Sequence, residues 1–226
     1  MEKFRKTLAH LQTEQIITSE QVALCLTIPL SKTRFMREKD GVNWWGRLFG
    51  HSIDFARRVA ENFEPWWEND EGKGYKHRVV IPVLTYITDL RETTRVAVFP
   101  DITLEKFREI MTDTGYRFVI LVAHHYQDRI EFAGGGIRID KVEALFSKAF
   151  VPVSVSYYFL VCEAGDLGEK LYKKGELFSQ ASSDAEIPVV PALHFLSVWI
   201  QELDGSQTLS QAYHAALSRY VSFYQP

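Results

Sequence analysis

Several features that would assign a 226-residue sequence quickly are absent from this one. It has only two cysteines, Cys25 and Cys162, which lie far apart and do not make a disulfide framework. No run approaches the roughly 18 consecutive apolar residues of a membrane-spanning helix. Residues 1–15 lack the apolar core of a secretory signal. We therefore expect reduced thiols, no membrane contact and a cytoplasmic location.

An excess of charge of one sign is also missing. The 26 basic and 29 acidic side chains give a net charge of −3, unlike the basic balance of a nucleic-acid-binding domain. With 46% hydrophobic residues the chain has the composition of a folded protein, and its length fits one large domain or two small ones. We expect no direct nucleic-acid partner.

The common sequence motifs of phosphate, zinc and serine-hydrolase sites do not occur. There is no G-x-x-x-x-G-K-[ST] loop, no H-E-x-x-H helix and no G-x-S-x-G elbow. The glycines at 134–136 precede the residues IRI rather than a helix start, which favours a hairpin turn over a phosphate cradle. No C-x-x-C pair is present, so neither a structural zinc ion nor another cofactor is predicted.

Two parts of the chain differ in their patterns. Residues 1–75 show helical spacing of apolar side chains and are rich in tryptophan, and the turn-rich stretch NDEGKGYKH at 69–77 closes them. From residue 76 onward, short apolar runs alternate with helical patterns. The sequence therefore predicts an N-terminal helical extension over 1–75 and one α/β domain over 76–226.

The alternation within 76–226 predicts a mainly parallel sheet with helices on both faces. Thr103 is a candidate N-cap, Gly115 a candidate helix stop, and Ser206 or Thr208 a second candidate N-cap. The expected strands are 79–87, 95–99, 117–123 and 153–161, with a hairpin of RIEF and IRI around residues 133–136; the expected helices are 103–115, 140–150, 192–203 and 209–223.

Two of the expected strands end directly in chemically reactive side chains. The run 117–123 is followed by His124 and His125, and the run 153–161 is followed by Cys162. If these strands are parallel neighbours, an imidazole and a thiol meet at one edge of the sheet, where α/β proteins gather their chemistry. A neighbouring imidazole activates a thiol as a nucleophile.

Other interpretations of the same residues stay open. A lone cysteine at a strand end is often a small buried apolar residue, and a histidine there is commonly a hydrogen-bonded surface residue. His124 and His125 could instead bind a metal ion together with Asp128.

Three segments carry a family resemblance: VILVAHHYQDRIEFAGGGI at 119–137, FLVCEAGDLGEKL at 159–171 and VVPALHFLSVWIQELDGSQTLSQAYHAALSRY at 189–220. In order and spacing they resemble the CHAT family of caspase-like cysteine peptidases, over about residues 79–224. The resemblance implies a caspase-like α/β fold and hydrolysis of a peptide bond by Cys162, with His124 as the base and His125 as the fallback. It implies no cofactor.

The chain departs from the family pattern at two places. Val161 precedes the cysteine where the family usually has alanine, and no glycine follows the candidate base. These departures support an alternative, a catalytically silent caspase-like module that binds peptides or scaffolds an assembly.

The resemblance also implies a protein substrate and a regulatory or sensor partner, in a bacterial pathway such as antiviral defence. We expect residues 1–75, with the pairs Trp44–Trp45 and Trp66–Trp67, to contact that partner. For substrate specificity, Asp128, Asp166, Arg129 and Arg138 are all candidate pocket residues, and Asp128 and Glu163 are expected to be solvated loop charges.

Overall fold

The computed structural model describes residues 15–28, 81–123, 125–126, 129–138, 141, 155–161, 178–181 and 189–224. The chain divides into two compact units, one made of Met1–Ile28 and Tyr86–Pro226 and the other of Pro29–Thr85. The sheet and nearly all of the described helices belong to the first unit.

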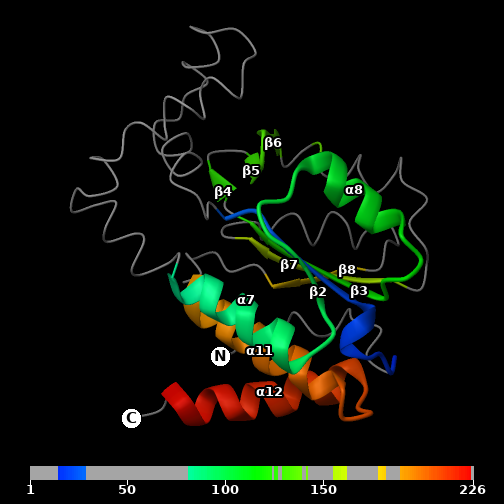
Figure 1. The fold of residues 1–226 in the computed structure, drawn as a ribbon, viewed down its shortest axis with the longest axis vertical. Coiled ribbons are helices and arrows are strands. Elements are labelled where there is room, and N and C mark those ends of the chain that lie inside the picture. The colour runs from blue at the N-terminus through cyan, green and yellow to red at the C-terminus, as the bar shows by residue number, and fades with distance from the viewer. Residues whose placement is uncertain are drawn as a thin grey trace, which may run out of the picture. The chain divides into compact units, whose positions relative to one another are not determined.

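A five-stranded sheet forms the centre of this unit (Figure 1). All neighbouring strands are parallel, so the expected parallel sheet is confirmed. In spatial order the strands are β2 (Ala97–Phe99), β1 (Val22–Leu26), β3 (Phe118–Ala123), β7 (Ser156–Val161) and β8 (Phe178–Ala181). Every residue of β1, β3 and β7 is buried, because helices cover both faces of the sheet.

Helices lie on the two sides of this sheet (Figure 1). One side carries α8 (Leu104–Thr112), and the other carries α11 (Val189–Leu203), α12 (Leu209–Tyr224) and α7 (Ile81–Thr93) from Tyr86 onward. Because successive strand residues point to opposite faces, each side has its own core. The α/β class predicted from the sequence is confirmed.

Aromatic side chains dominate the core on the α8 side. The ring of Phe107 in α8 lies 5.6 Å from that of Phe132 and 6.4 Å from that of Phe159 in β7. Next to them the Tyr157 hydroxyl donates to the carbonyl of Met111 at 3.1 Å, which ties β7 to the end of α8. Burial raises the pKa of Tyr157 well above its ordinary value, so it stays a neutral donor.

The core on the opposite side is built around Trp199 of α11, whose side chain is fully buried. Its ring lies 5.0 Å from Phe118 of β3, 5.2 Å from Tyr158 of β7 and 5.1 Å from Tyr213 of α12. Trp199 Nε1 also donates to the carbonyl of Leu209 at 3.2 Å. One side chain therefore joins the sheet to both C-terminal helices.

A smaller antiparallel sheet follows β3 along the chain. It consists of β4 (His125–Tyr126), β5 (Arg129–Phe132) and β6 (Gly135–Arg138), in that order. Gly134 and Gly135 at the β5–β6 turn have φ values of 92° and 149°, which favour glycine. The predicted hairpin of RIEF and IRI is confirmed, with β4 as an additional strand.

The expected strand over residues 79–87 is wrong, since residues 81–87 lie in helix α7 and the other two residues are outside the described part of the chain. The buried residues Val83, Ile87 and Leu90 follow helical spacing, while Leu84 is 46% exposed. Pro82 is compatible with the helix because it lies in the first turn, where its missing N–H costs no hydrogen bond.

The expected helical extension over residues 1–75 needs a correction at residues 22–26. This segment is β1, an interior strand that pairs with both β2 and β3. It therefore belongs to the α/β unit rather than to an extension beside it. Apart from residues 15–28, the expected extension lies outside the described residues, as does the expected helix 140–150 apart from Lys141.

Two helix starts follow the expected capping chemistry. Thr103 Oγ1 accepts from the backbone N–H of Lys106 at 3.2 Å and begins α8. Thr208 and Gln211 form a reciprocal pair of side chain–backbone bonds of 2.9 and 3.2 Å at the start of α12, so Thr208 is the cap. Gly115 is not the helix stop, because α8 ends at Thr112 with Asp113 as its C-cap.

A polar clamp closes the unit at the amino ends of the strands. Ser19, which is 1% exposed, donates its backbone N–H and its hydroxyl to the two carboxylate oxygens of Asp204, at 2.8 and 2.7 Å. Ser19 Oγ also accepts from the N–H of Arg95 at 3.0 Å. The clamp joins the approach to β1, the approach to β2 and the end of α11.

We predict that Ser19→Ala and Asp204→Ala each destabilise the protein by about 1.5–3 kcal/mol, since each removes at least one hydrogen bond to the Asp204 carboxylate. The double variant should lose less than the sum of the two, because both changes remove the same bond between the Ser19 hydroxyl and the Asp204 carboxylate. Urea unfolding of the four proteins measures this coupling. Thr112→Ala, at an exposed hydroxyl that bonds only within its own helix, should change stability by less than about 0.5 kcal/mol. Additive losses would refute the clamp.

Candidate active site at the carboxyl edge of the sheet

The strands β3 and β7 end together at the carboxyl edge of the sheet. They pair in parallel over six residues, from Phe118 opposite Ser156 to Ala123 opposite Val161. The next residues in the sequence are His124 and Cys162. The chain therefore leaves the sheet toward both residues from positions about 5 Å apart, the spacing of neighbouring strands.

This arrangement meets the condition set by the sequence analysis, that the two strands be parallel neighbours. It brings together the positions that precede His124 and Cys162. The two residues themselves lie outside the described part of the chain, as do Asp128, Glu163 and Asp166.

The same edge contains the point at which the strand order changes direction. The chain runs from β1 to β2 on one side and then crosses back to β3 on the other. In open α/β sheets, ligands bind beyond the carboxyl ends of the strands at such a switch point. The end of β3 therefore borders both the switch point and the seam with β7.

Backbone hydrogen bonds hold this edge in place. The N–H of Thr27 donates to the carbonyl of Val122 at 2.9 Å, and the N–H of Ile102 donates to that of Leu26 at 3.1 Å. The N–H of Ala133 in turn donates to the carbonyl of Ile102 at 2.9 Å. The hairpin is thereby tied through Ile102 to β1, so the segment that follows the candidate base rests on a fixed support.

The inner face of the small sheet is apolar. Ile130 and Phe132 are 1% and 3% exposed and belong to the core on the α8 side. On the opposite face, Arg129 and Arg138 are both exposed and lie directly opposite each other. Of the four candidate pocket residues, the structure describes these two, and it brings them together.

The thiol of the second cysteine, Cys25, is buried. Cys25 lies in the middle of β1, is completely buried and is a free cysteine. Burial in apolar surroundings raises the pKa of the Cys25 thiol well above its ordinary value, so the reactive thiolate is scarcely populated. Cys25 is therefore a core residue and no nucleophile.

The described residues contain no group of three or more histidine, cysteine, aspartate or glutamate side chains that could hold a metal ion. The alternative set of His124, His125 and Asp128 is not tested by this finding, because their side chains lie outside the described residues. Among the helices that the structure describes, none is long and apolar enough to span a membrane.

The structure also shows a polar cavity of about 380 Å³ at the amino edge, which the sequence analysis missed. Its lining residues come from the approach to β1, the end of α7 and the end of α11, and no short motif connects these segments. The ion pair of Glu20 and Arg95, at 3.5 Å, lies on its rim and is largely exposed. The lining residues are Thr18, Ser19, Glu20, Glu92, Thr93, Thr94, Arg95 and Asp204.

Comparison with known proteins does not assign the chain, since no family model and no curated protein matches it.

We predict that the two thiols differ strongly in their alkylation by iodoacetamide. Cys25 should remain unlabelled in the folded protein at every pH up to about 9, because it is buried and its pKa is raised. Cys162, if it is paired with an imidazolium, should label already near pH 6, since such pairing lowers a thiol pKa from its usual value of about 8.5. Mass spectrometry of both peptides against pH measures this.

Labelling in urea provides the control, since both thiols should then react alike. Labelling of Cys162 only above about pH 8 in the folded chain would show that no thiolate–imidazolium pair is assembled.

Proposed function

We propose that the chain is a cysteine endopeptidase of the caspase-like, CHAT type, which hydrolyses a peptide bond through Cys162 and His124. The observation that carries this proposal is the register of β3 and β7, whose last residues Ala123 and Val161 lie opposite each other. A dyad needs its two side chains within hydrogen-bond reach, and positions that directly follow paired strand ends favour such proximity.

In the proposed mechanism the sulfur of Cys162 attacks the scissile carbonyl carbon. His124 takes the thiol proton and later delivers it to the departing amine, which leaves an acyl-enzyme. Water, deprotonated by the same imidazole, then attacks the thioester and releases the second product. Backbone N–H groups of Cys162 and of the residue after the base would stabilise the oxyanion, each worth about 3 kcal/mol of the barrier.

The local backbone supports His124 rather than His125 as the base. His124 directly follows the last paired residue of β3, at the seam with β7. His125 already belongs to β4 of the small sheet, where it lies opposite Ile130. His125 is therefore better placed to contribute a backbone amide beside the reacting carbonyl than to act as the base.

The proposal includes a protein substrate and a regulatory partner that permits or positions cleavage, in a bacterial pathway such as defence. Because residues 1–75 include the interior strand β1, the partner surface cannot be located simply by deleting them. Removal of residues 1–75 would delete a central strand, so a truncation of this kind tests folding rather than partner binding.

The alternative function is a catalytically silent module of the same fold that binds peptides or scaffolds an assembly. Val161 favours it, because this larger residue fills the position before the cysteine and is fully buried in the core on the α8 side. A scaffold would keep its function when Cys162 is replaced by alanine, whereas a peptidase would lose it.

We predict that Cys162→Ala abolishes peptide-bond cleavage and that His124→Ala lowers it by about 10²–10⁴-fold, since these changes remove the nucleophile and the general base. The measurement counts new protein N-termini after the full chain is incubated with a bacterial lysate, which also supplies partners.

Matched controls are Cys25→Ala, in the core, and His214→Ala, at an exposed position of α12, both of which should keep cleavage. The peptidase proposal is refuted if the wild-type chain produces no new N-termini that depend on Cys162.

A further inference from the structure

The polar cavity at the amino edge of the sheet has the size of a small-molecule site. Its volume of about 380 Å³ falls within the range of roughly 300–1,000 Å³ that such sites occupy. Three carboxylates and one guanidinium line it, those of Glu20, Glu92, Asp204 and Arg95, and the other lining residues carry hydroxyl groups. The cavity therefore suits a charged ligand rather than an apolar one.

Hydrogen bonds fix the walls of this cavity. Buried Ser19 binds both carboxylate oxygens of Asp204, at 2.8 and 2.7 Å. Thr93 Oγ1 donates to the carbonyl of Asp89 at 2.7 Å and accepts from Gln201 Nε2 at 3.1 Å, which ties the end of α7 to α11. The segments that bound the cavity are thus joined before any ligand arrives, as a preorganised site requires.

Two charged side chains at the cavity keep binding capacity. Arg95 Nη1 lies 3.5 Å from Glu20 Oε2, and the Nε and Nη2 atoms of Arg95 have no partner in the described part of the chain. The carboxylate of Glu92 pairs with none of the described groups. Glu92 also lies in the last turn of α7, where the helix carbonyls disfavour a carboxylate, so a bound cation would stabilise it there.

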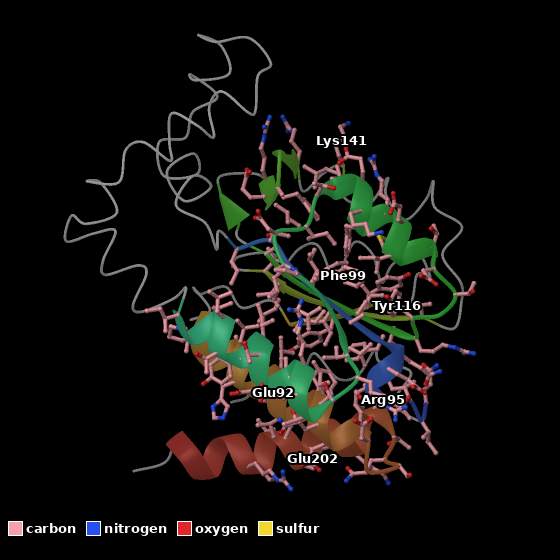
Figure 2. The ribbon with its side chains drawn as sticks, in the orientation of Figure 1. Glu92, Arg95, Phe99, Tyr116, Lys141 and Glu202 are labelled. Atoms are coloured by element: carbon pink, nitrogen blue, oxygen red, sulfur yellow. The ribbon has the colours of Figure 1, made fainter. Side chains whose placement is uncertain are left out.

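These two free groups have opposite charges and come from neighbouring segments. Figure 2 shows Glu92 at the end of α7 and Arg95 on the segment that leads into β2. Both line the cavity, yet the two described side chains form no ion pair with each other. A ligand that carries both an anionic and a cationic group can bind the two at once.

We infer that this cavity binds a molecule of the basic amino-acid class, whose carboxylate is bound by Arg95 and whose cationic groups are bound by Glu92 and the neighbouring carboxylates. The guanidinium fork binds both oxygens of a carboxylate. Three carboxylates against one guanidinium favour a ligand with a net positive charge. The inference does not rest on the proposed function, because the candidate dyad belongs to the carboxyl edge of the sheet.

Isothermal titration calorimetry of the full chain with L-arginine at low salt tests the site and should show saturable binding. Glu92→Gln and Arg95→Gln should each weaken it by about 10-fold or more, because each removes a charged hydrogen bond. Glu105→Gln and Arg108→Gln make the same charge changes at exposed positions of α8, on the other side of the sheet, and should alter the affinity by less than about 3-fold.

Agmatine, which is L-arginine without its carboxylate, separates the two contacts. Glu92→Gln should weaken the binding of both ligands, whereas Arg95→Gln should weaken that of L-arginine alone, because only L-arginine offers an anion to the guanidinium. The peptide alanyl-alanyl-arginine presents the same carboxylate and cation at a polypeptide C-terminus. Whichever of this peptide and L-arginine binds more tightly identifies the source of the ligand, and either result supports the inference.

Three outcomes would overturn the inference: no saturable binding of L-arginine or of the peptide, equal losses in the α8 variants, or an equal loss of agmatine binding in Arg95→Gln. Because calorimetry does not require cleavage, its failure is separate from that of the peptidase proposal, which the Cys162-dependent N-termini decide.

Discussion

The pairing of β3 with its two parallel neighbours is the constraint on which the rest of the structure depends. β3 bonds to β1 on one side and to β7 on the other, and all three strands are buried throughout. A shift of β7 by one residue would turn Tyr158 away from Trp199 and toward α8. The shift would expose neither face of the sheet to water, but it would disrupt the packing on both faces. The aromatic core around Trp199 and the position before Cys162 are therefore set by the same register.

Much of the α/β unit was predictable because its residues obey local rules. Continuous apolar runs identified β3 and β7, Thr103 identified the start of α8, and the glycines at 134–136 identified the hairpin. The strand β1 was missed, although VALCL at 22–26 is as continuously apolar as the run that forms β3. On either side of this run the apolar residues recur at helical spacing, which predicted helices over residues 1–75 as a whole.

Helix α7 was misassigned for a different reason. Over residues 79–87 a short apolar run fits a buried strand and a helix equally well, and only the burial of Val83, Ile87 and Leu90 separates the two periods.

The clamp at Ser19 was beyond sequence analysis, since its hydrogen bond joins residues 185 positions apart. For the candidate site, the strand ends were predictable, while the pairing of Arg129 with Arg138 needed the hairpin register.

The place of β1 in the sheet also has a consequence for biosynthesis. β1 ends at Leu26, whereas its neighbours β2 and β3 begin at Ala97 and Phe118. The whole of Pro29–Thr85 is translated in between. At about 5–20 residues per second, the synthesis of β1 is complete roughly 4–14 s before that of its first partner strand begins. During that interval this apolar segment lacks both of the strands that pair with it, and the sheet can close only after the second unit has been made.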